Sequence, residues 1–354
     1  MAESIRVLIV GLGKMGCSHS RAYHRLEGFE IVGLASHNLT QRDDLPSELL
    51  DYPRFDSYEE ALAELKPDAV SINTWPSTHA DYAIKAFAAG AHVFLEKPMA
   101  ETVEQAKRVI DAARAAQRKL VIGYILRHHP SWTKLVELGR GLGKPLVMRM
   151  NLNQQSAGAA WQVHKHLMES ISPIVDCGVH YVDMMCLLTQ AQPVKVHAIG
   201  VRLSDEIAQD MYNYGQLQVT FDDGSVGWYE AGWGPMISET AFFVKDVIGP
   251  KGSISIVMHE SAGSSDVDTH TKTNRLLIHR SELNAEGGFA HHDEMLDTAD
   301  EPNHNGLCRL EQAYFLRAIQ EDLDLEEHMQ DALNSLRIVL AADQSVRSGE
   351  VVTL

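Results

Sequence analysis

Continuous apolar runs alternate with amphipathic stretches over the first 125 residues of the chain. Such runs are typical of strands that are buried on both faces of a parallel sheet. The expected strands lie at 5–13, 29–36, 69–74, 91–96 and 120–125. The expected helices between them lie at 15–27, 58–68, 76–90 and 102–119. This alternation predicts βαβ units and a doubly wound parallel sheet.

The pattern changes after residue 125, where short segments alternate between apolar and polar residues. These segments lie at 145–153, 193–202, 214–233 and 240–258, and the third contains "FDDGSVG", which is typical of a hairpin turn. Residues 259–306 are polar and acidic, so we expect loops and short strands there, with helices following at 307–321 and 329–347. The second half therefore predicts an α+β domain with a large, open, mainly antiparallel sheet.

A glycine-rich turn follows the first expected strand. It consists of Gly11, Leu12, Gly13, Lys14, Met15 and Gly16. In a G-x-G-x-x-G turn between strand and helix, the glycines allow a tight turn, close approach of a pyrophosphate, and close helix packing. The helix N-terminus then faces the phosphates. We therefore expect a dinucleotide-binding Rossmann-type domain over 1–124 and an α+β substrate-binding and oligomerisation domain over 125–354.

The end of the second expected strand distinguishes NAD from NADP in such domains, because a carboxylate there binds the ribose 2′-hydroxyl. This chain has Ser36 and His37 at that place, and the nearest arginine is Arg42. The missing carboxylate removes a repulsion against a 2′-phosphate, but no arginine adjoins Ser36 to bind one. We expect Ser36 and His37 to contact the cofactor, and the choice between NAD and NADP stays open.

A charged pair ends the expected strand at 91–96, where "HVFLEKPM" places Glu96 and Lys97 before a proline. Ligands of a doubly wound sheet lie beyond the carboxyl ends of its strands. Glu96 and Lys97 are therefore expected at the cofactor, with the Lys97 ammonium beside the nicotinamide. The alternative is an ordinary solvated pair of surface charges.

A second group of ionisable residues lies within "SPIVDCGVHYVDMM" at 172–185. If this stretch is one helix, Asp176, His180 and Asp183 share one side of it. A carboxylate one turn from a histidine orients the ring, and a histidine transfers protons near neutral pH. The alternative is a polar helix face with a structural histidine.

The chain resembles the glucose–fructose oxidoreductase / inositol dehydrogenase / MocA (Gfo/Idh/MocA) family in "GLGKMG", in the "EKP" at 96–98 and in "DCGVHYVD" at 176–183. The resemblance covers essentially the whole chain, including the ending "ALNSLRIVLAADQSVRSGEVVTL". It implies that Lys97, Asp176 and His180 are the catalytic residues. It also implies that the bond between Lys97 and the following proline is cis.

Two further stretches are compared with the family. "TWPSTH" is similar to its T-x-P-x-x-H cofactor loop, which implies cofactor contacts for Thr74, Pro76 and His79. The glycine triplet that usually precedes the catalytic aspartate is replaced by Ser170-Ile171-Ser172. This departure lies near the expected substrate site, so it bears on the substrate more than on the class of reaction.

The resemblance implies an NAD(P)-dependent oxidoreductase that moves a hydride between nicotinamide and a secondary hydroxyl or ketone of a sugar, polyol or glycoside. The residues expected to contact this carbohydrate are Arg127, Asn153, Trp161, His164 and Lys165. Two alternatives are a redox-assisted, NAD-dependent glycosidase on the same fold and a non-catalytic dinucleotide-binding regulator. The presence of Lys97, Asp176 and His180 argues against the regulator.

The charge of the chain limits its partners. With 31 Lys and Arg against 48 Asp and Glu, the formal net charge is −17, so we expect neither nucleic acid nor membrane as a partner. The four cysteines form no CxxC pair, which favours a reducing, cytoplasmic compartment. The histidine pairs at 128–129 and 291–292 lack the spacing of a metal site, so no metal is expected. An open antiparallel sheet favours a homodimer or homotetramer formed through it.

Overall fold

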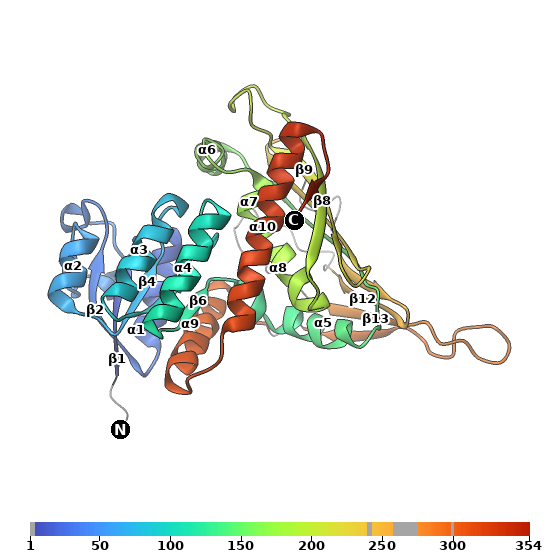
Figure 1. The fold of residues 1–354 in the computed structure, drawn as a ribbon, viewed down its shortest axis with the longest axis horizontal. Helices are drawn as coiled ribbons and strands as arrows, with labels where there is room; N and C mark the ends of the chain where they lie inside the picture. Colours follow the sequence, from blue (N-terminus) through green and yellow to red (C-terminus); the bar gives the residue numbers. More distant parts are fainter. Residues whose placement is uncertain (1–3, 239–242, 258–274, 299–300) are drawn as a thin grey trace. The chain divides into compact units, whose positions relative to one another are not determined.

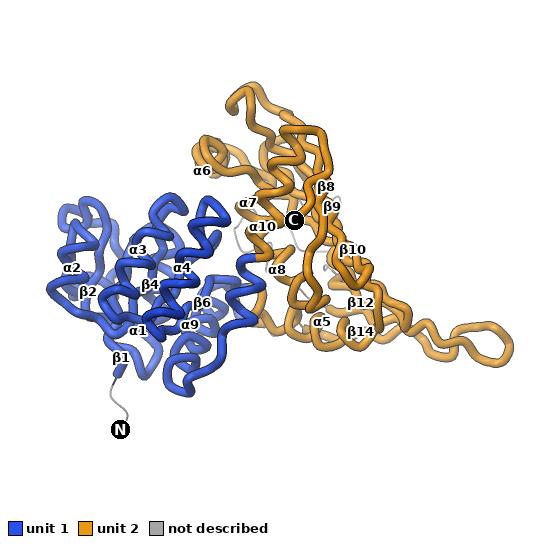
Figure 2. The backbone as a smooth tube through the Cα atoms, in the orientation of Figure 1, with its two compact units in different colours: residues 1–125, 302–333 blue, residues 126–301, 334–354 orange. Residues whose placement is uncertain are grey.

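The computed structural model describes residues 4–238, 243–257, 275–298 and 301–354. The chain forms two compact units, residues 1–125 with 302–333 and residues 126–301 with 334–354 (Figure 2). A segment from the C-terminal half thus belongs to the first unit, a return that the expected domains 1–124 and 125–354 do not contain. In the described part of the chain, no helix is both long enough and apolar enough to cross a membrane.

The first unit contains a six-stranded parallel sheet in the order β3-β2-β1-β4-β5-β6. Its strands are β1 (Ile5–Val10), β2 (Phe29–Ala35), β3 (Arg54–Phe55), β4 (Ala69–Ile72), β5 (His92–Leu95) and β6 (Leu120–Ile122). The strand order reverses direction between β1 and β4, and ligands of such sheets bind beyond the strand ends at this point. The predicted doubly wound parallel sheet is confirmed.

Helices cover both faces of this sheet (Figure 1). They are α1 (Lys14–Arg25), α2 (Tyr58–Leu65), α3 (Pro76–Ala88), α4 (Val103–Ala116) and α9 (His304–Gln320), with short 3-10 turns η1 (Leu39–Gln41) and η2 (Ser47–Leu49). Helix α1 packs against α9, and α3 packs against α4. Phe315 of α9 is fully buried in one core cluster with Val7 and Phe94 of the sheet, which anchors the returning segment.

The second unit contains a nine-stranded sheet in the order β14-β13-β12-β11-β7-β10-β9-β8-β15. Its strands are β7 (Val147–Gln155), β8 (Pro193–Val201), β9 (Tyr214–Phe221), β10 (Val226–Gly234), β11 (Lys245–Gly249), β12 (Gly252–Val257), β13 (Arg275–Arg280), β14 (Glu294–Asp297) and β15 (Val352–Thr353). Strands β7 and β10 pair in parallel, and the other described pairs are antiparallel. This confirms the predicted large, mainly antiparallel sheet.

Helices lie against one face of the nine-stranded sheet (Figure 1). They are α5 (Pro130–Arg140), α6 (Gly158–Leu167), α7 (Pro173–Asp176), α8 (Gly178–Thr189) and the part of α10 (Glu326–Ser348) beyond residue 333, while η3 (Ile125–His128) precedes α5. Tyr181 of α8 stacks on Tyr229 of β10 with 5.0 Å between ring centroids. The opposite face carries exposed apolar side chains. These are Val147, Ile199, Val201 and Val226.

Among the elements without a counterpart in the sequence-based prediction are β3, α5 and α6. Strand β3 has two residues, and α6 buries only Trp161, so neither produces a clear apolar period. The short strands expected within 259–306 include β13 and β14. The parts of the predicted segments at 240–242, 258–274 and 299–300 lie outside the described residues.

Candidate active site

The turn between β1 and α1 has no room for side chains at two of its glycines. Gly11 has φ +85°, and a Cβ there would stand 2.6 Å from the carbonyl oxygen of Asn73. A Cβ on Gly16 would stand 1.7 Å from the carbonyl oxygen of Gly11. Backbone therefore packs directly on backbone where β1, α1 and β4 meet, as the first and third glycines of the motif require.

The middle glycine of the turn, Gly13, faces open space. Apart from its chain neighbours, no heavy atom of the described residues lies within 4 Å of the place of a Cβ. Gly13 is the N-cap of α1, its end of the helix has no side-chain cap hydrogen bond, and the first turn has no acidic residue. Lys14 is exposed beside Gly13, Met15 is half-buried and Leu12 is buried. These features fit a pyrophosphate, which needs close backbone approach and N–H donors.

The structure brings Arg42 to the same turn. The Arg42 guanidinium donates a hydrogen bond of 2.8 Å to the carbonyl oxygen of Leu12 and two bonds of 2.7 and 2.9 Å to the Asp44 carboxylate. Ser36 and His37 lie between the end of β2 and this arginine, and His37 is exposed. The sequence spacing did not indicate this proximity, because η1 folds the chain back toward the glycine turn.

The "TWPSTH" segment follows β4 and contacts the segment that follows β5. Pro76 begins α3, and the Thr74 and Thr78 hydroxyls are 2.6 Å apart. His79 is fully buried, with Nδ1 2.7 Å from the carbonyl oxygen of Pro98 and Nε2 3.0 Å from that of Thr74. Burial lowers the pKa of His79, against the opposing effect of these two hydrogen bonds. His79 thus holds the end of β4 to the segment that follows β5.

Glu96 and Lys97 follow β5, and the peptide bond between Lys97 and Pro98 is cis. Glu96 is buried, with Oε1 2.7 Å from Nε2 of His19 and Oε2 accepting a 3.0 Å hydrogen bond from the Lys97 backbone N–H. Burial opposes ionisation of Glu96, yet the hydrogen bond from His19 and the positive charge of Lys97 outweigh it and lower the pKa of Glu96. The Glu96 carboxylate therefore faces the interior of the unit.

In the second unit, Asp176 and His180 lie on two consecutive helical pieces. The single helix supposed for 172–185 is divided: Asp176 ends α7, His180 lies in the first turns of α8, and Cys177 joins them in helical conformation. Because Cys177 keeps this conformation, the spacing of four residues still sets the aspartate and the histidine about one turn apart. His180 is buried and Asp176 is half-buried.

Arg127 and Asp183 form a pair of their own within the second unit. The Arg127 guanidinium donates hydrogen bonds of 2.7 and 2.8 Å to the two oxygens of the fully buried Asp183 carboxylate. This bidentate geometry fixes both side chains. Arg127 was predicted as a carbohydrate contact and Asp183 as a residue on the same helix side as His180, and the structure joins these two residues by the hydrogen bonds described above.

Three of the predicted carbohydrate contacts lie on α6. His164 stacks on Trp233 with 4.4 Å between ring centroids and an interplanar angle of 10°. Burial lowers the pKa of His164 to about 4, and the negative charge of Asp176 acts in the opposite direction. Trp161 is buried and donates to Glu206, which also accepts a 2.6 Å hydrogen bond from Lys165. His164 is therefore placed near Asp176, whereas the other two are bonded to Glu206.

Asn153 and its neighbour point to opposite faces of the sheet, as successive residues of a strand do. Asn153 donates a 2.8 Å hydrogen bond to Glu230 on the face opposite the helices. Gln154 instead accepts hydrogen bonds from Trp233 at 2.6 Å and from the Cys177 thiol at 3.4 Å. Sequence reasoning missed Gln154 and Trp233. Only the pairing of β7 with β10 reveals them, because 79 residues separate the two side chains.

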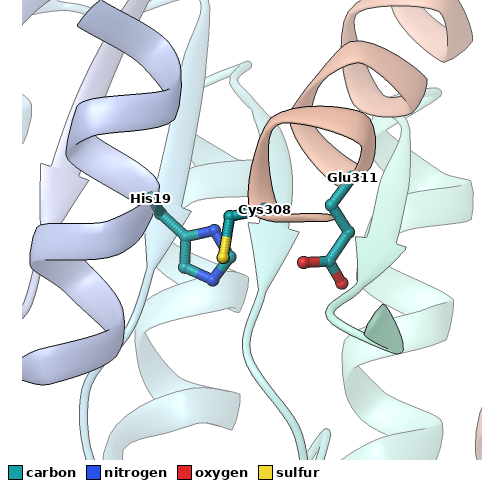
Figure 3. Close-up of side chains that lie close together, drawn as sticks. All are labelled: His19, Cys308 and Glu311. Atoms are coloured by element: carbon teal, nitrogen blue, oxygen red, sulfur yellow. The ribbon is translucent and has the colours of Figure 1, made fainter. Parts of the chain in front are cut away.

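One group of residues in the described part of the chain has the composition of a metal site. His19, Cys308 and Glu311 are buried, and their candidate ligand atoms lie within 4.8 Å of one another (Figure 3). Figure 3 shows the imidazole of α1 facing the thiol and carboxyl groups of α9. The two ring nitrogens of His19 are, however, bonded to Glu96 and Gln312.

Comparison with known proteins assigns the two units to one family. The model of an oxidoreductase family with an NAD-binding Rossmann fold matches residues 5–124, and the model of that family's C-terminal α/β domain matches residues 134–354. The chain belongs to the Gfo/Idh/MocA oxidoreductase family. This confirms the predicted family and the nucleotide-binding character of the first unit.

Two relatives illustrate the likeness within the Gfo/Idh/MocA family. The UDP-N-acetylglucosamine 3-dehydrogenase of Acidithiobacillus ferrooxidans is 32% identical over 197 residues, which are 56% of this chain and 58% of the relative. The scyllo-inositol 2-dehydrogenase (NAD(+)) of Bacillus subtilis is 28% identical over 270 residues, 72% and 75% of the two chains. The chain therefore aligns with little more than half the length of the first relative.

A solved structure extends the comparison to almost the whole chain. The WlbA dehydrogenase from Bordetella pertussis, in complex with NADH and UDP-GlcNAcA, matches with a TM-score of 0.76 and 20% identity, covering 99% of this chain and 98% of the other. At this identity the match concerns the fold. Both units thus have the arrangement of elements that this family member has.

Proposed function

We propose that the protein is an NAD(P)-dependent dehydrogenase that acts on a secondary hydroxyl of a sugar, polyol or glycoside. The observation that carries the proposal is the position of Lys97. It directly follows β5, at the carboxyl edge of the same sheet whose β1–α1 turn suits the phosphates of a dinucleotide. An ammonium at this edge lies where ligands of doubly wound sheets bind.

Lys97 has an electrostatic role in this proposal. Its ammonium donates a hydrogen bond to the oxygen of the reacting carbinol and stabilises the negative charge that develops there. When bound, the nicotinamide accepts the hydride from the carbinol carbon. The contact of His79 with the Pro98 carbonyl oxygen, at 2.7 Å, holds the backbone next to Lys97 in a defined position.

His180 and Asp176 supply the proton chemistry and the orientation of the substrate. His180 removes the hydroxyl proton as the base, and it returns the proton when the ketone is reduced. Asp176 binds a substrate hydroxyl or orients His180 one helical turn away. Both residues lie in the second unit.

The class of substrate follows from what the relatives share. One acts on UDP-N-acetylglucosamine and another on scyllo-inositol, and both compounds carry rings with several secondary hydroxyls. The stack of His164 on Trp233, close to Asp176, supports the same class in this chain, because aromatic faces and hydroxyl-binding carboxylates recognise such rings. All five predicted contacts have a hydrogen-bond partner in the protein, and His164 is preferred among them because the charge of Asp176 acts on it.

The experiment is a panel of hexoses, inositols, glycosides and nucleotide sugars, each assayed with NAD and with NADP by the absorbance of the reduced nicotinamide. The proposal expects at least one polyol to reduce the cofactor. Released aglycone without net change in cofactor would indicate the redox-assisted glycosidase. Cofactor binding without turnover of any compound in wild-type protein would indicate a regulator.

We also propose that the protein forms a homodimer or homotetramer through the outer face of the nine-stranded sheet. Val147 and Val226 are paired neighbours on that face and are 40% and 38% exposed, and Ile199 is 51% exposed. Covering such a face removes apolar side chains from water. Light scattering should show a dimer or tetramer that Ile199→Lys weakens and Leu50→Lys, an exposed leucine of the first unit, does not. A wild-type monomer at micromolar concentration would contradict the proposal.

A further inference from the structure

Helix α9 brings two buried polar residues to the base of the Glu96–Lys97 segment. The helix belongs to the C-terminal half of the sequence but lies in the first unit, packed against α1. Its residues Glu311 and Gln312 are fully buried. The mechanism proposed above uses neither residue, yet both lie beside the His19–Glu96 pair that adjoins Lys97.

Hydrogen bonds join Gln312 to the backbone of Lys97 in three steps. The Gln312 amide nitrogen lies 2.9 Å from Nδ1 of His19. Nε2 of His19 lies 2.7 Å from Oε1 of Glu96, and Oε2 of Glu96 accepts a 3.0 Å hydrogen bond from the Lys97 N–H. We call these four residues, Gln312, His19, Glu96 and Lys97, the α9 relay.

The donors and acceptors of the α9 relay define the protonation of His19. An amide nitrogen only donates, so Nδ1 of His19 accepts from Gln312. An ionised carboxylate only accepts hydrogen bonds, so Nε2 of His19 carries the proton and donates a hydrogen bond to Glu96. The His19 imidazole is then neutral and has one defined tautomer. The direction of each hydrogen bond in the α9 relay depends on the direction of the one before it.

The neighbours of Glu96 favour a single negative charge at this place. His19 of α1 and Glu311 of α9 face the Glu96 carboxylate, and the charges of His79 and Lys97 also act on it. Burial and the negative charge of Glu96 raise the pKa of Glu311 well above its usual range. The Glu96 carboxylate is thus the negative group that balances the Lys97 ammonium.

We propose that Gln312 is a positioning residue for Lys97, acting through the tautomer of His19 and the orientation of the Glu96 carboxylate. The inference rests on the proposed function, because it assigns a role to the surroundings of Lys97 in that reaction. It also gives a reason why residues 302–333 join the first unit: they complete the support of the segment after β5.

A metal ion on His19, Cys308 and Glu311 is the competing interpretation of the same cluster. Ligand atoms around zinc lie about 2.0–2.3 Å from the ion, and a metal-bound His19 has to give up its bond to Gln312 or to Glu96. The geometry favours the relay because both nitrogens of His19 have partners at hydrogen-bond distance. Glu311 Oε1 and Gln312 Oε1, which have no hydrogen-bond partner among the described residues, face the same interior.

The test compares Gln312→Met, which keeps the size of the side chain and removes the donor, with Gln320→Met, an exposed glutamine on the same helix. Gln312→Met is expected to lower kcat about 10-fold, the size of effect of one lost buried hydrogen bond. The KM for the cofactor should stay the same. The alkaline limb of the kcat–pH profile should move to lower pH, because a disordered Glu96 carboxylate stabilises the ammonium less. Gln320→Met should behave as wild type.

A second measurement does not depend on turnover. Nitrogen NMR shifts of His19 in the wild-type protein should show the neutral tautomer with the proton on Nε2, and Gln312→Met should populate both tautomers. An unchanged kcat and pH profile in Gln312→Met would overturn the relay, as would an imidazolium at neutral pH. One equivalent of bound zinc that is lost in Cys308→Ser would also overturn it. Wild-type turnover in Lys97→Met would refute the proposed function, while the tautomer would still test the hydrogen bonds.

Discussion

The two units carry their functional features in different ways. In the first unit, the proposed nucleotide site consists of backbone atoms: a glycine turn, the N-terminus of α1 and the ends of parallel strands. In the second unit, side chains from strands and helices far apart in the sequence meet on one face of a mainly antiparallel sheet. A local motif therefore identifies the first kind of site, whereas long-range pairing is needed to recognise the second.

The largest expected effect concerns the glycines of the first unit. Gly16→Ala places a Cβ 1.7 Å from the carbonyl oxygen of Gly11, so we expect a loss of more than about 3 kcal/mol in the free energy of unfolding. Gly13→Ala meets open space and should keep its stability while binding the cofactor at least about tenfold more weakly. Thermal unfolding and cofactor titration measure both. Equal destabilisation by the two substitutions would contradict a site made of backbone.

The second unit should respond to pH through Lys245. This lysine is buried against Phe243, 3.7 Å from the ring centroid, and burial lowers its pKa to about 7. Below pH 7 both the folded and the unfolded protein carry the charge, so the full cost of burying it applies. Between about pH 7 and pH 10.4 the folded protein loses the proton first, and the cost disappears.

Lys245→Met should therefore be more stable than wild type at pH 6, by up to about 4 kcal/mol. The difference should shrink towards pH 10, because the lysine is then neutral in the folded wild-type protein. Urea unfolding of both proteins at several pH values measures the difference and cancels the contributions of other groups. A difference that does not change with pH would show that Lys245 titrates normally.

A smaller effect is expected where the second unit supports Asp176. Ser172 is the N-cap of α7, accepts from the Val175 N–H and donates a 2.6 Å hydrogen bond to Asp343 of α10. Ser172→Ala should cost about 1–2 kcal/mol as a lost cap, and it should lower kcat because Asp176 ends the same short helix. Ser172→Thr keeps the hydroxyl and serves as the control. Reduced stability with unchanged kcat would limit Ser172 to a structural role.

The smallest effect separates two predicted carbohydrate contacts. His164 stacks on the helix-facing Trp233, whereas Asn153 bonds Glu230 on the opposite face of the sheet. His164→Ala should raise the KM for the substrate severalfold, on the scale of about 1 kcal/mol for a lost contact, and Asn153→Ala should leave it unchanged. Steady-state kinetics with the best substrate of the panel decide this. A larger increase of KM from Asn153→Ala than from His164→Ala would indicate that the substrate binds on the face of the sheet opposite the helices, which would contradict this proposal.

The sequence patterns predicted much of the first unit, because its information is local. The glycine spacing, the apolar run before Glu96 and the proline at the start of α3 each lie within a few residues of the feature they indicate. Arg42 was not placed at the turn, since a loop of irregular structure carries it there. Membership of α9 in this unit also needed the fold, because Phe315 reaches a core formed some 200 residues earlier.

The second unit was predicted only in outline. Alternation indicated the strands, but the parallel pairing of β7 with β10 joins segments that no local pattern connects. That pairing determines which face Asn153 and Gln154 occupy, and therefore which of them lies near Asp176. The exposed helix α6 escaped prediction because its buried side consists of Trp161 alone.

The most direct measurement is a double-mutant comparison of Lys97→Met, His180→Gln and the combined variant. The account predicts that each single substitution lowers kcat by about 10³-fold or more. The double variant should be little less active than the less active single variant, because both groups act on one oxygen in one step. Cofactor affinity should stay near that of wild type in all three. Losses that multiply fully, or wild-type turnover in either single variant, would contradict the proposal that Lys97 and His180 act on the same alcohol.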